Sequence, residues 1–196
     1  MIIDGNSLEK NYHAKADAVV IGSGAGGAPM AYYLASAGLN VIVLEEGGKN
    51  KQSEFGKDVW KAANTMYRDA MTTITLGAPA IPLPLGMTLG GTTTINSGTC
   101  FRTPEKIFSQ WKTSAGLNGF EYKNLIPHFE VIEKMLHVKE VPFELMGSNN
   151  TLFAKGAEKL HLHGKPIKRN SSGCNGSGIC VFGCPENAKM SMENTF

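Results

Sequence analysis

The sequence is poor in cysteine and shows no sign of an export signal. Only four of its 196 residues are cysteines, too few for the disulfide framework of a small secreted domain. The first 17 residues lack the basic start and the apolar block of a signal peptide. These two absences indicate a reducing compartment, and we expect the protein to be cytoplasmic.

The chain also lacks a strong charge of either sign. Its formal net charge is +2, which gives no electrostatic argument for binding nucleic acid. The densest basic stretch, residues 159–169, is interpreted as a solvated face of the protein. We therefore expect no nucleic-acid partner.

Charge is wholly absent from residues 70–101, a run of 32 residues. Prolines at positions 79, 82 and 84 exclude a continuous apolar helix, so we expect no membrane span here. A run this rich in Gly, Pro and Thr is typical of extended chain and tight turns. Because it carries no charge, we expect it to be buried against something large.

A β-α-β unit is predicted near the start of the chain. Residues 18–22 and 41–45 are short apolar runs typical of buried parallel strands. The segment between them predicts a helix that has Pro29 in its first turn and ends at Gly38. Further helices are expected over residues 58–71, from Thr103 as N-cap to Gly116, over 121–136, and over 151–161, where Asn150 is the cap and Leu152, Phe153 and Leu160 face inward.

A Gly22-x-Gly24-x-x-Gly27 sequence joins the first strand to the first helix. Its glycines permit a tight turn, a close approach of a pyrophosphate to the helix N-terminus, and close packing of helix on strand. An acid at the end of the second strand is placed to bind ribose hydroxyls. The pattern predicts a dinucleotide site, without choosing FAD or NAD, and a ligand-free glycine turn is the alternative. Its residues are Gly22, Ser23, Gly24, Ala25, Gly26, Gly27 and Glu45.

A second motif, "GMTLGGTTTINSGTCFRTP" over residues 86–104, resembles the flavin-facing segment of the glucose–methanol–choline (GMC) oxidoreductases. Met87 and Cys100 depart from the usual residues of that family, so we assign them no role. The resemblance implies FAD as the cofactor, since glycine N–H groups and neutral Thr and Asn side chains suit the edge of a flavin ring. The residues implied are Gly90, Gly91, Thr92, Thr93, Asn96, Gly98 and Thr99.

The resemblance covers the chain from residue 17 onward. It implies a doubly wound, Rossmann-like α/β FAD-binding domain of the glutathione-reductase type over residues 14–120. A helical and loop region over 121–196 would then begin the substrate domain or continue the FAD domain. The implied reaction is oxidation of an alcohol to a carbonyl, with hydride passing to flavin N5 and electrons going on to oxygen or an external acceptor.

The catalytic histidine of the family lies far toward the C-terminus, and none of the five histidines present matches it. The chain is therefore predicted to be a fragment, and no catalytic residue is assigned. Two other functions stay open: an NAD(P)H-dependent flavin reductase, which would need a second GxGxxG motif, and a non-enzymatic flavin or electron-transfer module. The residues do not select among sugar, sterol, fatty and aromatic alcohols.

Three of the four cysteines, Cys174, Cys180 and Cys184, fall within eleven residues, and Pro185 follows. With Ser177 in place of one cysteine, the spacing follows the bacterial ferredoxin run, and three thiolates suit a [3Fe-4S] cluster. The spacing also resembles that of the cluster-carrying sugar dehydrogenases among the GMC proteins. The alternative is a packed, glycine-shaped loop with Cys184 as N-cap of a short helix. Zinc and a disulfide are less favoured.

The cluster interpretation predicts iron in the full-length protein. Broad visible absorbance should extend beyond the flavin bands, and Cys180→Ser should abolish electron transfer to an external acceptor while FAD stays bound. An iron content near zero after anaerobic purification would contradict the cluster and leave the packed loop.

Overall fold

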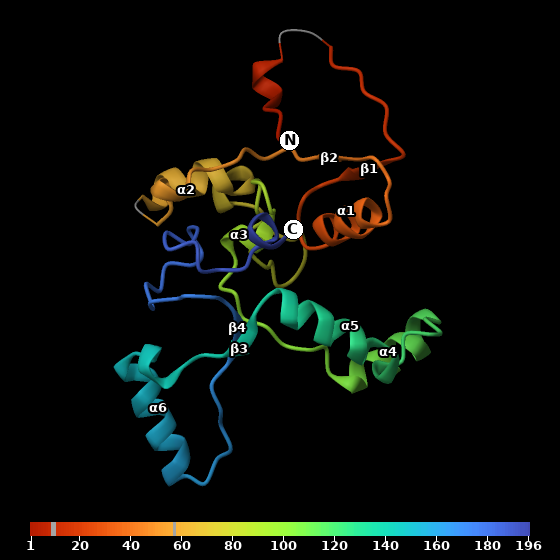
Figure 1. The fold of residues 1–196 in the computed structure, drawn as a ribbon. Helices are drawn as coiled ribbons and strands as arrows, with labels where there is room; N and C mark the ends of the chain where they lie inside the picture. The colour runs from red at the N-terminus through yellow and green to blue at the C-terminus, as the bar shows by residue number, and fades with distance from the viewer. Residues whose placement is uncertain (9–10, 57) are drawn as a thin grey trace. The chain divides into compact units, whose positions relative to one another are not determined.

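The structure is a computed structural model that describes residues 1–8, 11–56 and 58–196 (Figure 1). The chain divides into two compact units. Unit 1 consists of Met1–Ser97, Ile179–Asn187 and Ser191–Phe196, and unit 2 consists of Gly98–Gly178 and Ala188–Met190. Each unit is described by itself below.

Unit 1 is built on a β-α-β arrangement. Strands β1 (Ala18–Ile21) and β2 (Val41–Leu44) are parallel, with Ala18 opposite Val41. Helix α1 (Gly27–Ser36) lies beside both strands (Figure 1). Gly38, with φ +89°, closes the helix by donating its N–H to the carbonyl of Ala35 at 2.9 Å. The predicted β-α-β unit is confirmed, because the two strands pair in parallel and the helix between them provides the crossover that a parallel pair requires.

Helix α2 (Val59–Met66) begins where Asp58 accepts a hydrogen bond from the N–H of Lys61 at 3.0 Å. The prediction that this helix continues to residue 71 is wrong. Asp69 and Ala70 both have φ of 48°, a left-handed conformation that no α-helix continues through. The short helices of unit 1 are η1 (Gly5–Ser7), η2 (Gln52–Glu54), η3 (Arg68–Met71), α3 (Thr92–Ile95) and α7 (Met192–Thr195).

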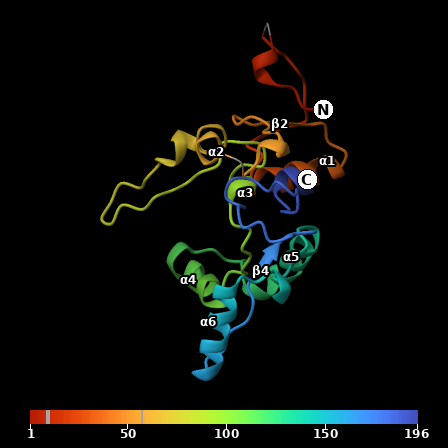
Figure 2. The same ribbon diagram turned by 90° about the vertical axis from the view of Figure 1, so that its left-hand side faces the viewer.

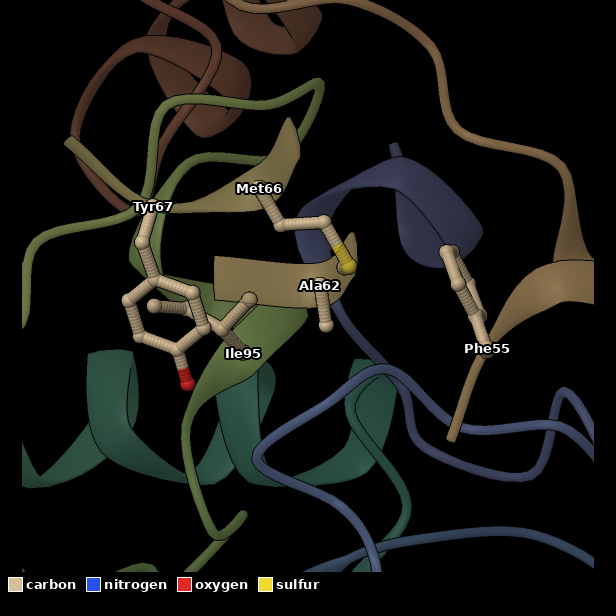
Figure 3. Packing of buried hydrophobic residues seen from close by; sticks show 5 residues of the cluster. All are labelled: Phe55, Ala62, Met66, Tyr67 and Ile95. Carbon is tan, nitrogen blue, oxygen red and sulfur yellow. The ribbon is translucent and has the colours of Figure 1, made fainter. Parts of the chain in front are cut away.

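A buried cluster of five residues forms the core of unit 1: Phe55, Ala62, Met66, Tyr67 and Ile95 (Figure 3). Phe182 packs against this cluster. The Tyr67 hydroxyl donates to the carbonyl of Val181, and the N–H of Gly56 donates to the carbonyl of Phe182 at 2.9 Å. The segment 179–187, which carries two of the cysteines, therefore covers one side of the core.

The uncharged run is not buried along its whole length, which corrects the prediction. Most of residues 86–95 are buried or half-buried, whereas every residue from 76 to 85 is exposed. Residues 72–85 form an extended hairpin that projects beyond α2 (Figure 2, yellow to yellow-green). Across residues 1–8, 11–56 and 58–196, no helix has the length and apolarity needed to cross a membrane.

Unit 2 consists mainly of helices with a short antiparallel ladder. Its elements are α4 (Glu105–Ala115), α5 (Tyr122–Met135), β3 (Val138–Glu140), η4 (Phe143–Leu145), α6 (Ser148–Lys159) and β4 (Lys168–Asn170). Phe108 of α4 makes an edge contact with Phe129 of α5. Arg102 forms a bidentate ion pair with Glu133, in which Nε donates to Oε1 at 2.8 Å and Nη2 donates to Oε2 at 2.7 Å. The Arg102 guanidinium also lies over the Phe129 ring. These contacts hold the two helices together.

Two predicted helix starts in unit 2 are wrong. Helix α4 has Pro104, not Thr103, at its N-cap position, although Gly116 ends it in a left-handed conformation as predicted. Helix α6 has Gly147 as its N-cap, so Asn150 lies inside the helix. The leucines and the phenylalanine of α6 that were expected to face inward are 67–80% exposed, because no described part of the chain covers them.

We predict that Gly183→Ala destabilises the protein more than Gly173→Ala. Both glycines have positive φ, so both alanines carry the same backbone strain. At Gly183 a Cβ would also lie 2.3 Å from Cγ of Phe55, whereas at Gly173 it would meet nothing within 4 Å. We expect a difference of about 1–3 kcal/mol in the free energy of unfolding of the full-length protein in urea. Equal losses would show that residues 179–187 do not pack on the core.

Candidate functional site

The strand-to-helix loop has the backbone geometry that its glycines predict. Gly22 has φ +88° and donates its N–H to the carbonyl of Leu44 at 2.7 Å. A Cβ at Gly27 would lie 1.9 Å from the carbonyl oxygen of Gly22, so only glycine lets α1 start this close to β1. The expected reason for the third glycine of the motif, close packing of helix on strand, is confirmed.

The other side of this loop is open. A Cβ at Gly22 or Gly26 would meet nothing within 4 Å, and one at Gly24 would meet only the Cα of Gly91 at 3.9 Å. The first N–H groups of an α-helix have no partner within the helix, and the helix dipole favours negative charge there. The loop thus combines open space with free donors at the start of α1, and these features fit a pyrophosphate group.

Glu45, at the end of β2, is held by three hydrogen bonds from the loops around it. Its Oε2 accepts from the Ser23 N–H at 2.8 Å and from the Ser23 hydroxyl at 2.6 Å, and its Oε1 accepts from the Gly47 N–H at 2.9 Å. Partial burial acts to raise the pKa of Glu45, but the hydrogen bonds from Ser23 and Gly47 outweigh it, so the pKa lies below its ordinary value. The carboxylate is therefore ionised at neutral pH.

Ser23 connects this carboxylate to the second motif. Its buried hydroxyl, which donates to Glu45, also accepts a hydrogen bond from the Gly90 N–H at 2.9 Å. The backbones of the two motifs come close as well, because a Cβ at Gly91 would lie 3.1 Å from the Cα of Gly24. The structure therefore brings the predicted residues of the first loop, Glu45 and the Gly90–Gly91 turn together.

The threonines after this turn use their hydroxyl groups to hold it in place. The Thr93 hydroxyl donates to the carbonyl of Gly90 at 2.6 Å and accepts from the N–H of Met192 at 3.0 Å. The Thr92 hydroxyl accepts from the N–H of Gly86 at 3.0 Å. Asn96 donates its N–H to the carbonyl of Thr92 at 2.9 Å and is exposed.

Gly98 and Thr99, the last two residues predicted for the site, belong to unit 2. Gly98 has φ +71°, and its carbonyl accepts from the N–H of Asn170 at 3.2 Å. Thr99 forms an isolated antiparallel bridge with Arg169. Within unit 2 both residues are therefore joined to the β4 strand.

Two residues at the site, Gly47 and Thr88, were not predicted. Thr88 has no exposed surface, donates its hydroxyl to the carbonyl of Gly48 at 3.1 Å and accepts from the Asn50 amide at 3.0 Å. A Cβ at Gly47 would lie 2.1 Å from the Thr88 N atom, so these two backbones are in contact. The adjacent glycines after the acidic pair at 45–46 were the sequence signal for this close approach.

The three clustered cysteines are divided between the units, with Cys174 in unit 2 and the other two in unit 1. Cys184 is buried and lies 3.7 Å from a carboxylate oxygen of Glu186. The expected helix at Pro185 is absent: residues 184–187 form a turn in which the Asn187 N–H donates to the carbonyl of Cys184 at 3.0 Å. In the described part of the chain, no three His, Cys, Asp or Glu side chains form a group that could hold a metal. The cluster stays a prediction.

Comparison with known proteins identifies the family. Residues 63–196 match the family described as GMC oxidoreductase, and residues 17–66 match the FAD binding domain. The chain belongs to the GMC oxidoreductases. The resemblance seen in the two glycine motifs is confirmed, and the open loop at the start of α1 fits the pyrophosphate of FAD, the cofactor of this family.

Relatives of this GMC chain come from bacteria and plants. An uncharacterised GMC-type oxidoreductase of Mycobacterium tuberculosis is 44% identical over 91% of the chain, which spans 29% of that protein. The long-chain-alcohol oxidase FAO3 of Arabidopsis thaliana is 31% identical over 93% of the chain, which spans 24% of it. The chain thus spans less than a third of the length of these relatives.

The fold is shared with a solved oxidase structure. The crystal structure of pyridoxine 4-oxidase from Mesorbium loti matches with a TM-score of 0.65 and 16% identity, covering 92% of this chain and 39% of that one. At this level of identity the match concerns the fold, and it supports the predicted Rossmann-like α/β class.

We predict that Glu45→Gln lowers the free energy of unfolding at neutral pH. In acid, the variant and the wild type should have the same free energy of unfolding. A glutamine presents an N–H where the carboxylate accepts one, which leaves a donor facing a donor. Because the folded-state pKa of Glu45 is lowered, its contribution is complete above the unfolded-state pKa and is lost as the pH falls through the folded one. Unfolding in urea between about pH 3 and pH 7 measures this. A constant difference across that range would contradict the role of the ionised carboxylate.

Proposed function

We propose that the full-length protein is an FAD-dependent oxidoreductase that oxidises the CH–OH group of an alcohol to a carbonyl. The observation that carries this proposal is the contact between the two motifs. The Ser23 hydroxyl joins Glu45 to the Gly90 N–H, so the segment suited to the adenosine end of FAD and the segment suited to its ring meet in one unit. The family membership supports the same reaction class.

We assign the pyrophosphate of FAD to the open side of the Gly22–Gly27 loop. The backbones of Gly24, Ala25 and Gly26 lie there, at the positive end of α1. Gly22 contributes open space beside the loop, since its own N–H donates to the carbonyl of Leu44. The Ser23 side chain takes a different role, because its hydroxyl and its N–H are both used to hold Glu45. Ser23 therefore shapes the loop and does not contact phosphate directly.

The Glu45 carboxylate can accept a further hydrogen bond from a ligand. A carboxylate accepts about four hydrogen bonds, and three come from Ser23 and Gly47. Its Oε1 accepts only one of these, so this oxygen is the acceptor that we assign to a ribose hydroxyl of FAD. The lowered pKa keeps it an acceptor at neutral pH.

The turn at Gly90–Gly91 and the residues Thr92, Thr93 and Asn96 are proposed to lie along the flavin ring, with Gly98 and Thr99 continuing the same segment. When bound, FAD would accept the hydride that leaves the carbinol carbon of the alcohol. The hydroxyl groups of Thr92 and Thr93 are occupied within the turn, so their part is to orient backbone N–H groups. No catalytic base is assigned within the described residues, and the electrons are proposed to go to oxygen or an external acceptor.

The domain boundaries predicted from the sequence stay proposals. We propose that residues 14–120 belong to the FAD-binding domain, and that residues 121–196 continue it or begin the substrate domain. The substrate is proposed to be a small-molecule alcohol.

We predict that Ala25→Asp in the full-length protein raises the dissociation constant of FAD at least ~10-fold, equivalent to about 1.4 kcal/mol. The new carboxylate would repel the pyrophosphate at the start of α1. The matched control is Ala35→Asp, the same change at an exposed position farther along α1, which should leave FAD affinity close to that of the wild type. Flavin fluorescence titration measures both. A colourless wild-type protein that does not take up added FAD would overturn the proposed function.

A further inference from the structure

Arg68, two residues beyond the end of α2, is held at both ends. Its backbone N–H donates to the carbonyl of Leu85 at 2.9 Å, and Tyr67, the residue before it, is buried in the core of unit 1. At the other end, the Arg68 guanidinium pairs with the carboxylate of Glu46. A free arginine side chain samples many rotamers in water. The two anchors therefore fix a group that would otherwise move.

This ion pair brings the guanidinium of Arg68 to the end of β2. The segment that carries Arg68 and the loop that carries Glu46 are both paired with residues 86–88, because Tyr67 bridges to the first of these residues and Gly48 to the last. Glu46 directly follows the acid that we assign to a ribose hydroxyl. A positive, planar group thus lies at the carboxyl end of β2, on the residue next to that acid.

The exposure of the pair leaves it accessible to a ligand. The Arg68 side chain is 38% exposed, and the Glu46 side chain is 56% exposed. An ion pair in such contact with water contributes little to the stability of a protein. A guanidinium that is held flat at a surface can, however, stack on an aromatic ring, which attracts the cation and covers its weakly hydrated face.

We propose that the adenine of FAD stacks on the Arg68 guanidinium and that Glu46 holds this guanidinium in place. This inference rests on the proposed function. Adenine and the ribose hydroxyls are carried by the same sugar ring, so a ribose bound to Glu45 brings the base to this end of β2. The ion pair also neutralises Glu46, which would otherwise add a second negative charge beside Glu45 and the pyrophosphate.

Three substitutions at one position separate stacking from charge. In the full-length protein freed of flavin, Arg68→Ala and Arg68→Lys should each raise the dissociation constant of FAD about 10-fold, since lysine keeps the charge but has no flat face. Arg68→Tyr, which keeps a flat face and removes the charge, should stay within about threefold of the wild type. Flavin fluorescence titration measures all three.

The matched control removes a cation from another exposed ion pair of unit 1. Lys61 pairs with Glu54 at 3.0 Å, and the side chains of these two residues are 50% and 42% exposed. Lys61→Ala should leave the dissociation constant of FAD unchanged. Urea unfolding of each flavin-free variant establishes that it is folded. A loss of FAD affinity in Lys61→Ala as large as that in Arg68→Ala would overturn the inference.

The outcomes separate the inference from the proposed function. If the wild type takes up FAD and Arg68→Ala binds it as tightly, the inference is wrong and the proposed function stands. Rescue by lysine but not by tyrosine would show that charge alone acts, and an equal loss in all three variants would show a structural role only; either result overturns the stacking. A wild-type protein that takes up no FAD overturns the proposed function itself.

Discussion

The site of this protein depends on one partly buried carboxylate. Glu45 accepts hydrogen bonds from Ser23 and Gly47, and Ser23 in turn accepts from Gly90, which lies 67 residues farther along the chain. A neutral glutamine has one acceptor oxygen for these three donors, and hydrogen bonds to an ionised acceptor are about twice as strong as neutral ones. The same hydrogen bonds lower the pKa of the carboxyl group, so the interaction that orders the loops also keeps Glu45 ionised, the form in which we propose that it accepts a ribose hydroxyl.

The glycines around the site divide into those that pack against another backbone segment and those that face open space. Gly27, Gly47 and Gly91 are in backbone contact with Gly22, Thr88 and Gly24 respectively, and a side chain at any of the three would separate these segments. Gly22, Gly24 and Gly26, in contrast, have little or nothing within 4 Å of where a Cβ would lie. Close packing thus accounts for the first group, and the open space beside the second group is where we propose that the pyrophosphate lies.

The cysteine-bearing loop contributes to the fold whether or not it holds a metal. Phe182 packs on the core of unit 1, Gly183 lies against the ring of Phe55, and the Gln52 amide donates to the carbonyl of Pro185 at 2.9 Å. These contacts explain a loop rich in glycine near Cys180 and Cys184 without reference to thiol chemistry. They also place the two cysteines of unit 1 in the layer that covers α2.

The sequence by itself determined the β-α-β unit, the glycine turn between its first strand and helix, and the family, because the period of the apolar residues and the position of glycines are local properties of the chain. Helix ends were less predictable: the left-handed residues Asp69 and Ala70 end a helix whose apolar pattern continues. Only the tertiary structure decided that Ser23 holds Glu45, that Thr88 is buried against Gly47, and that residues 76–85 of the uncharged run are exposed. These features depend on contacts between segments far apart in the chain, and burial is a property of what packs around a residue, which its own neighbours in the sequence do not specify.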